Sequence, residues 1–122
     1  MNILNQIKPI ITNEDNIIFA YIFGSYAKGD FLDSSDVDIA LYLRNDSFDY
    51  QLQIIKKLNS KIHQDIDLVI LNRAKNLFLI EDIINNSIII KDHPRRIEYE
   101  TYRWMEIVDF KELDKRLERC IA

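Results

Sequence analysis

Both glycines of this 122-residue chain, Gly24 and Gly29, lie in one short window that ends at Asp38. Glycine is favoured where the backbone turns sharply or approaches a ligand closely, because it has no Cβ atom. The window contains Gly24-Ser25, then ten residues, then Asp36-Val37-Asp38. A chain without glycine elsewhere concentrates its tightest backbone here, and we expect a ligand site at this point.

The first half of the window has the features of an anion-binding turn. Residues 17–23 (IIFAYIF) form an apolar, β-branched and aromatic run, which predicts a buried strand ending at Gly24. Residues 25–28 predict a single helical turn, whose free backbone N–H groups attract an anion. The Ser25 hydroxyl adds a donor and Lys28 adds a positive charge. We expect Gly24, Ser25 and Lys28 to bind the phosphates of a nucleotide.

The second half of the window supplies paired carboxylates. Residues 36–43 (DVDIALYL) predict a strand, in which Asp36 and Asp38 share one face about 6.6 Å apart. Aspartate is a poor strand former and like charges repel, so a hard divalent cation between the two side chains explains the arrangement best. Mg²⁺ suits the pair, because it accepts a few carboxylates and completes its shell with water and phosphate oxygens.

A third carboxylate is expected from a later strand, residues 65–71 (DIDLVIL). A carboxylate that faces the pair from a neighbouring strand would orient or deprotonate an attacking hydroxyl, or bind a second metal ion. Asp65 and Asp67 share a face, so both are candidates. We favour Asp67, because the apolar part of the strand follows it directly, whereas Asp65 lies where a solvated turn residue is ordinary.

These motifs resemble those of a known family. Gly-Ser, ten residues and Asp-x-Asp resemble the signature of the DNA polymerase β-like nucleotidyltransferase superfamily, and GSYAKGDFLDSSDVDIALYL looks like its minimal members. The IDLVILN strand, the helix after it, the SIIIKD segment and the final helix from RRIEYETYRW are similar to the minimal nucleotidyltransferase (MNT) antitoxins of HEPN/MNT toxin–antitoxin pairs.

The resemblance implies a fold and an activity. The implied fold is α+β, a short mixed sheet packed by helices and followed by a long C-terminal helix. The implied activity is transfer of AMP from ATP to a tyrosine hydroxyl of a partner HEPN ribonuclease toxin, in a hetero-oligomeric complex. Asp36, Asp38 and Asp67 would then hold one or two Mg²⁺ ions and carry the catalysis.

Two other functions stay open at the level of sequence. The chain would also serve as an antitoxin that neutralises its partner by binding alone, without transfer chemistry. A nucleotidyltransferase for a small molecule such as an aminoglycoside would carry the same signature. That acceptor needs its own pocket, which in a chain of this length only oligomerisation or the final helix would provide.

Length and charge limit the remaining possibilities. We expect one domain, residues 1–122, because the chain has no linker or repeat and is long enough for one core. A net charge of −4 argues against stable binding to nucleic acid. The chain has no signal peptide pattern and no apolar run of membrane-spanning length, and Cys120 has no partner for an internal disulfide. We therefore expect a cytoplasmic protein.

Hydrophobic periodicity predicts the helices around the strands. The first covers residues 2–12, where Pro9 predicts a kink or an early end. The second covers residues 48–62 and packs on the sheet. A third covers residues 77–84, is broken at 85–86 and precedes a short strand at 87–91. The first two helices are expected to bury the residues that recur at helical spacing: Ile3, Leu4, Ile7, Ile10 and Ile11, and Phe48, Leu52, Ile55, Leu58 and Ile62.

The final helix begins near Asp92 and Pro94 and carries more apolar surface than one contact requires. Packing against the domain's own core is one interpretation of this surface. Binding of a partner is the other, since aromatic clusters are enriched at binding hot spots. The side chains concerned are a predicted stripe of Ile97, Thr101, Trp104, Val108, Leu113 and Leu117, and the aromatic residues Tyr99, Tyr102 and Phe110 beside it.

Overall fold

A computed structural model describes residues 2–32 and 34–121, and its centre is a four-stranded mixed sheet in the order β3-β2-β1-β4. β1 pairs antiparallel with both β2 and β4, and β2 pairs parallel with β3. The sheet and its helices confirm the predicted α+β architecture with a long C-terminal helix. The strands are β1 (Ile17–Phe23), β2 (Val37–Leu43), β3 (Ile66–Ile70) and β4 (Ile88–Lys91).

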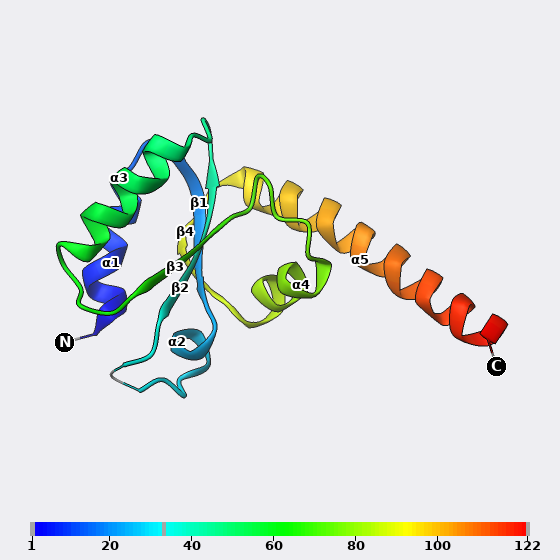
Figure 1. The fold of residues 1–122 in the computed structure, drawn as a ribbon. Coiled ribbons are helices and arrows are strands. Elements are labelled where there is room, and N and C mark those ends of the chain that lie inside the picture. Colours follow the sequence, from blue (N-terminus) through cyan, green and yellow to red (C-terminus); the bar gives the residue numbers. More distant parts are fainter. Residues whose placement is uncertain (1, 33, 122) are drawn as a thin grey trace.

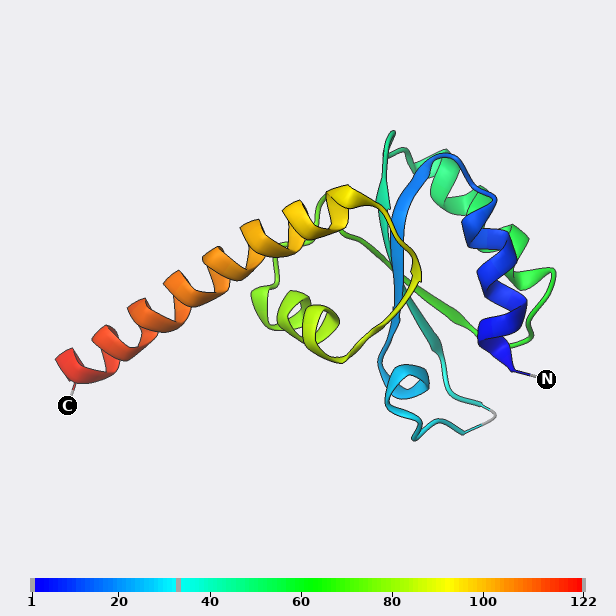
Figure 2. The same cartoon turned by 180° about the vertical axis from the view of Figure 1, so that it is seen from behind.

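Helices cover both faces of this sheet (Figure 1). α1 (Ile3–Thr12) and α3 (Phe48–Asn59) lie on one face. α4 (Leu77–Asn86) and the beginning of α5 (Pro94–Ile121) lie on the other. α2 (Ser25–Lys28) is a single turn at the end of the sheet, between β1 and β2. α5 continues far past the sheet, as both views show (Figures 1 and 2).

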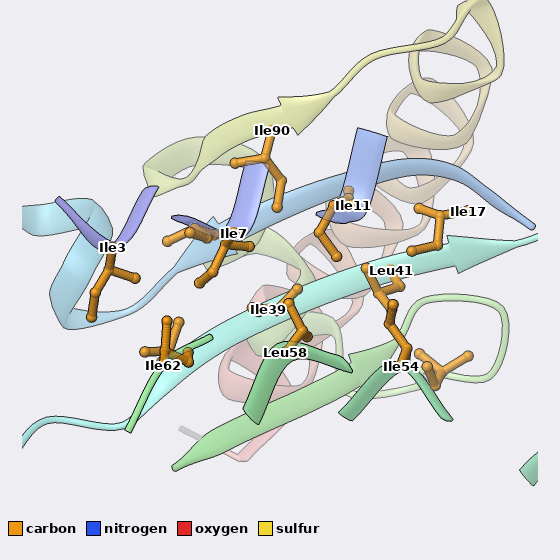
Figure 3. Close-up of a cluster of buried hydrophobic side chains, with 14 of the residues drawn as sticks. Ile3, Ile7, Ile11, Ile17, Ile39, Leu41, Ile54, Leu58, Ile62 and Ile90 are labelled. Atoms are coloured by element: carbon orange, nitrogen blue, oxygen red, sulfur yellow. The ribbon is translucent and has the colours of Figure 1, made fainter. Parts of the chain in front are cut away.

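The two layers of the core differ in composition. Alternate residues of β2 point to opposite faces, so that Ile39 and Leu41 join the α1/α3 layer and Ala40 joins the α4/α5 layer. The α1/α3 layer is built largely of isoleucine and leucine (Figure 3). β1 is buried at all seven positions, which explains its continuous apolar sequence. The centre of the sheet is therefore packed by apolar side chains on both faces.

The α4/α5 layer is aromatic and fixes the beginning of α5. The rings of Phe19 and Tyr42 stack with centroids 4.9 Å apart. The Tyr21 hydroxyl donates a hydrogen bond to Glu100 Oε2 at 2.7 Å, and Arg96 Nη1 donates to the same oxygen at 2.7 Å. Burial, and then the hydrogen bond to Glu100, raise the pKa of Tyr21. A satisfied polar network thus joins the central strand to the last helix.

The predicted buried face of α3 is wrong in part. Phe48 and Leu52 are 71% and 51% exposed, whereas Ile54 is 1% exposed and Leu58 is fully buried. The Tyr50 hydroxyl donates to Glu14 Oε1 at 2.7 Å. Tyr50 lies four residues before Ile54 and therefore on the same side of the helix, so this contact turns that side toward the core. The helix also ends at Asn59, three residues before the predicted end at residue 62, and Ile62 is buried from the loop that follows.

The end of α4 also differs from the sequence prediction, whereas α1 ends at Thr12 as predicted. Of the two effects expected of Pro9, a kink or an early end, the early end is wrong. Proline removes only the bond to the carbonyl of Asn5, which is exposed and therefore open to water. α4 continues through Asn86, whose amide donates to Asp82 Oδ1 at 2.9 Å. None of the described helices combines the length and the apolar character needed to cross a bilayer.

The difference between the two sides of α3 can be measured. Ile54→Ala should lower the free energy of unfolding by about 2–5 kcal/mol, because it leaves a cavity in the α1/α3 layer. Leu52→Ala should change it by less than about 0.5 kcal/mol, since Leu52 is exposed. Urea denaturation of both variants checks this, and equal losses would show that the buried face is wrongly assigned.

Candidate functional site

Gly24 brings the end of β1 against the carboxylate of Asp38. Its φ of +71° and ψ of −147° lie in a region that only glycine adopts readily. A Cβ atom at Gly24 would lie 2.2 Å from Asp38 Oδ2, well inside van der Waals contact. The preceding residue, Phe23, pairs with Asp38 across the β1–β2 ladder. Glycine is therefore required here both for the backbone conformation and for the space that Asp38 occupies.

The turn after Gly24 is the predicted single helical turn. Lys28 N donates to Gly24 O at 3.1 Å, and Asp30 N donates to Ser25 O at 3.2 Å. Gly29 ends α2 in the left-handed conformation, with φ +79°, and a Cβ atom there would meet no atom within 4 Å. The two glycines thus have different roles, because Gly29 supplies only a backbone conformation and Gly24 also supplies space.

Asp38 and Asp67 lie side by side on neighbouring strands. They are register partners in the parallel β2–β3 ladder, so their side chains leave the same face of the sheet. That face carries Ala40 two residues further on, and is therefore the α4/α5 face. Asp38 is half-buried and Asp67 is exposed. Desolvation by burial and the negative charges of Asp67 and Asp36 raise the pKa of Asp38.

The other two predicted carboxylates lie just outside the strands. Asp36 and Asp65 each precede their strand by one residue and are exposed. The carbonyl of Asp65 accepts a hydrogen bond from Val37 N at 2.8 Å, so its main chain extends the ladder. In residues 2–32 and 34–121, no three acidic, histidine or cysteine side chains are arranged closely enough to hold a metal ion. The sheet itself aligns two of the predicted carboxylates, and the charge of Asp36 acts on one of them.

The donor set of these residues fits a hard cation. Carboxylate oxygens are the ligands that Mg²⁺ prefers, and it needs only one or two of them from the protein. The raised pKa of Asp38 shows that its negative charge is poorly compensated by the surrounding protein. A cation beside Asp38 and Asp67 would relieve this repulsion. The site thus combines a turn with free donors and a pair of crowded carboxylates.

Lys28 has a neighbour that the sequence did not indicate. Its Nζ lies 3.8 Å from Asp82 Oδ1, and the two side chains are 50% and 35% exposed. An ion pair this long and this exposed contributes little to stability, so Lys28 can exchange it for another anion. Asp82 comes from α4, more than fifty residues along the chain, and no local pattern marks it. Its carboxylate places a further acidic group on the α4 side of the turn.

Comparison with known proteins gives a family and a fold. Residues 5–96 match the family model described as polymerase beta, nucleotidyltransferase. No curated protein matches the chain at a significant level.

Three solved structures are similar over almost the whole chain. A toxin–antitoxin crystal structure with AMP-PNP has a TM-score of 0.76 at 22% identity, with 98% of each chain covered. A tri-AMPylated Shewanella oneidensis HEPN toxin in complex with its MNT antitoxin gives 0.70 at 20%, with 98% of this chain and 97% of that chain covered. The toxin–antitoxin MntA–HepT gives 0.69 at 19%, with the same coverage. At these identities the likeness shows a shared fold.

The crowding of the carboxylates predicts a coupled titration. Asp67→Asn removes the neighbouring charge that has the larger effect on Asp38, so the pKa of Asp38 should fall toward its ordinary value of 3.8. Because the folded state holds the Asp38 proton more tightly than the unfolded state, this group stabilises the fold at low pH. That contribution is lost as the pH rises through its raised pKa. NMR titration of the carboxyl carbons in the parent, Asp67→Asn and the control Asp65→Asn measures the shift, and an unchanged pKa in Asp67→Asn would contradict the coupling.

The two glycines predict unequal costs of substitution. Gly24→Ala should destabilise the fold by about 3 kcal/mol or more, because backbone strain adds to a clash with Asp38. Gly29→Ala should cost about 1–2 kcal/mol, because only the left-handed conformation is strained. Urea denaturation compares them, and equal costs would show that the contact between Gly24 and Asp38 is unimportant.

Proposed function

This chain belongs to the polymerase β nucleotidyltransferase family, and from that premise we propose that it transfers AMP from ATP to a tyrosine hydroxyl of a HEPN-type toxin. The observation that supports this most is the Asp38–Asp67 pair, which the sheet register holds beside the Gly24 turn. The similar structures include a complex with AMP-PNP and a tri-AMPylated HEPN toxin bound to its antitoxin. The chain acts as an antitoxin in a hetero-oligomeric complex.

The turn after Gly24 holds the triphosphate. The first N–H groups of α2 have no partner within the helix, so they are available to phosphate oxygens together with the Ser25 hydroxyl. Lys28 adds a positive charge when it leaves Asp82, since that exposed ion pair is weak. These groups bind the outer phosphates and present the α-phosphorus to the carboxylates.

Asp36, Asp38 and Asp67 are the residues that would hold one or two Mg²⁺ ions. When bound, Mg²⁺ offsets the charge that develops on the leaving pyrophosphate. Burial and the negative charges of Asp67 and Asp36 raise the pKa of Asp38, and a bound cation would stabilise its ionised form. The exposed position of Asp36 allows it to turn toward the pair.

Asp67 acts as the general base for the acceptor hydroxyl. It is the exposed member of the pair, so the acceptor hydroxyl reaches it from solvent. Asp67 orients the hydroxyl and accepts its proton as the oxygen attacks the α-phosphorus. A new oxygen–phosphorus bond forms, the bond from the α-phosphorus to the bridging oxygen breaks, and pyrophosphate leaves in line. AMP is then joined to the tyrosine through a phosphodiester.

The transfer can be tested with a HEPN-type toxin as the acceptor. Incubation with ATP and Mg²⁺ should add one or more AMP units to the toxin, seen by intact-mass analysis. Asp38→Asn should reduce the rate by about 10³-fold or more, because it removes a charge that acts in the transition state. Asp65→Asn is the matched control and should retain activity. Undiminished transfer of label from α-labelled ATP by Asp38→Asn would refute the role of this residue.

Neutralisation by binding alone gives a different result in the same assay. The apolar surface that α5 leaves exposed would suit such an antitoxin. A toxin that stays inhibited by the Asp36→Asn/Asp38→Asn variant, with no gain in mass, would favour binding alone. A toxin that stays active in the presence of this variant would favour catalysis.

A further inference from the structure

The exposed apolar surface of this protein is concentrated on α5. Among the described residues, fourteen large hydrophobic side chains are exposed, and eight of them lie on this helix. Only Ile107 of α5 is buried among the residues described. Single exposed hydrophobic residues are normal on soluble proteins, but a concentration of this kind marks a binding surface.

Part of this surface is a regular seam along one flank of the helix. Ile97, Thr101, Trp104 and Val108 are spaced by four, three and four residues, which is the spacing of a seam between two packed helices. Ile97, Trp104 and Val108 are 61%, 41% and 49% exposed. Of the two interpretations left open for this stripe, packing on the domain's own core is therefore wrong for these three side chains. The helix meets the domain through a different side, which includes Glu100 and Ile107.

Leu113 and Leu117 belong to another flank, and they are not a continuation of the seam. The step of five residues from Val108 to Leu113 turns the helix by about 140° relative to the seam. Leu113 and Leu117 are 54% and 52% exposed. α5 thus presents apolar side chains on two flanks, one near the sheet and one toward the C-terminal end.

The described side chains of the last third of α5 are exposed. Lys111 pairs with Glu81 of α4, and every described side chain from Lys111 to Cys120 is exposed. The projecting part is visible in both views (Figures 1 and 2). A ten-residue helix is marginally stable alone in water, so this projecting segment, which carries Leu113 and Leu117 among charged residues, gains stability when another protein covers it.

We propose that α5 is the docking surface for the acceptor protein, which lays an α-helix along the seam of Ile97, Thr101, Trp104 and Val108. This inference rests on the proposed function and names the surface that delivers the acceptor. The beginning of α5 packs on the same face of the sheet that carries Asp38 and Asp67, because Tyr99 and Ala40 share one cluster. A protein seated on α5 therefore lies on the catalytic side of the sheet.

The exposed area suits a protein partner. Half-exposed side chains of this size each leave on the order of 100 Å² uncovered. Over both flanks of α5, the eight exposed side chains give on the order of 800 Å², which is what one partner contributes to a standard interface when it contacts both flanks. A second copy of this chain is not the acceptor of the proposed transfer, so we assign the surface to the acceptor protein.

The test compares two double variants on α5. Trp104→Ala/Val108→Ala removes the two seam residues nearest the C-terminus, and Glu98→Ala/Asp109→Ala removes exposed side chains of the same helix outside the seam. The seam variant should bind the unmodified HEPN-type toxin at least about 30-fold more weakly, because truncated aromatic anchors dominate such interfaces. Its affinity for AMP-PNP should not change. The control variant should bind both as the parent does, and circular dichroism verifies that both variants are folded.

The outcomes separate this inference from the proposed function. Unchanged toxin binding by the seam variant would overturn the docking surface, even if AMP transfer is observed. Weakened binding without any transfer by the parent would leave the docking surface in place and overturn the proposed function. If the parent is a dimer in multi-angle light scattering and the seam variant a monomer with unchanged toxin binding, the surface belongs to a second copy and the inference is wrong.

Discussion

The contact between the Gly24 backbone and the Asp38 carboxylate is the constraint on which the site depends. It exists because β1 ends at Phe23, opposite Asp38, so the turn that follows is placed beside the carboxylate. The parallel ladder then places Asp67 next to Asp38. A shift of one residue in either ladder would move the carboxylates to the α1/α3 face, because strand side chains alternate. The buried pattern of β1 and β2 fixes this register, so the same apolar residues that form the core also position the acidic ones.

The crowded carboxylates of the site are electrostatically unfavourable, and the packing of the rest of the sheet offsets this destabilisation. Asp38 is half-buried with two carboxylates near it, and its raised pKa records the unfavourable charge. Such crowding is tolerated where function needs it and where the surrounding structure is firm. Here the firmness comes from the isoleucine-rich layer under α1 and α3 (Figure 3). The exposed position of Asp67 and the open turn at Gly24 leave room for phosphate and acceptor on the opposite face.

Local patterns of the sequence predicted the strands and the turn, because both are local. The alternation of side chains along a strand predicted which residues share a face with Asp38. Gly24 predicted the position of the turn. The buried side of α3 was missed because it depends on Tyr50 meeting Glu14, which lies 36 residues earlier in the chain. Asp82 was missed for the same reason, since only the packing of α4 brings it to Lys28. The sequence also suggested one stripe on the last helix, whereas the step from Val108 to Leu113 separates it into two flanks.

The division of α5 explains how one helix can serve both the fold and a partner. Its beginning is joined to the central strand through Tyr21, Glu100 and Arg96, so its direction is set by the same sheet that aligns the carboxylates. Every described side chain of its end, from Lys111 to Cys120, is exposed, and Lys111 pairs with Glu81 of α4. A protein held by the exposed seam would therefore take its orientation from β1, and through β1 from Gly24 and Asp38. Positioning of a large acceptor would thus be transmitted through the packed strands that also hold the carboxylates.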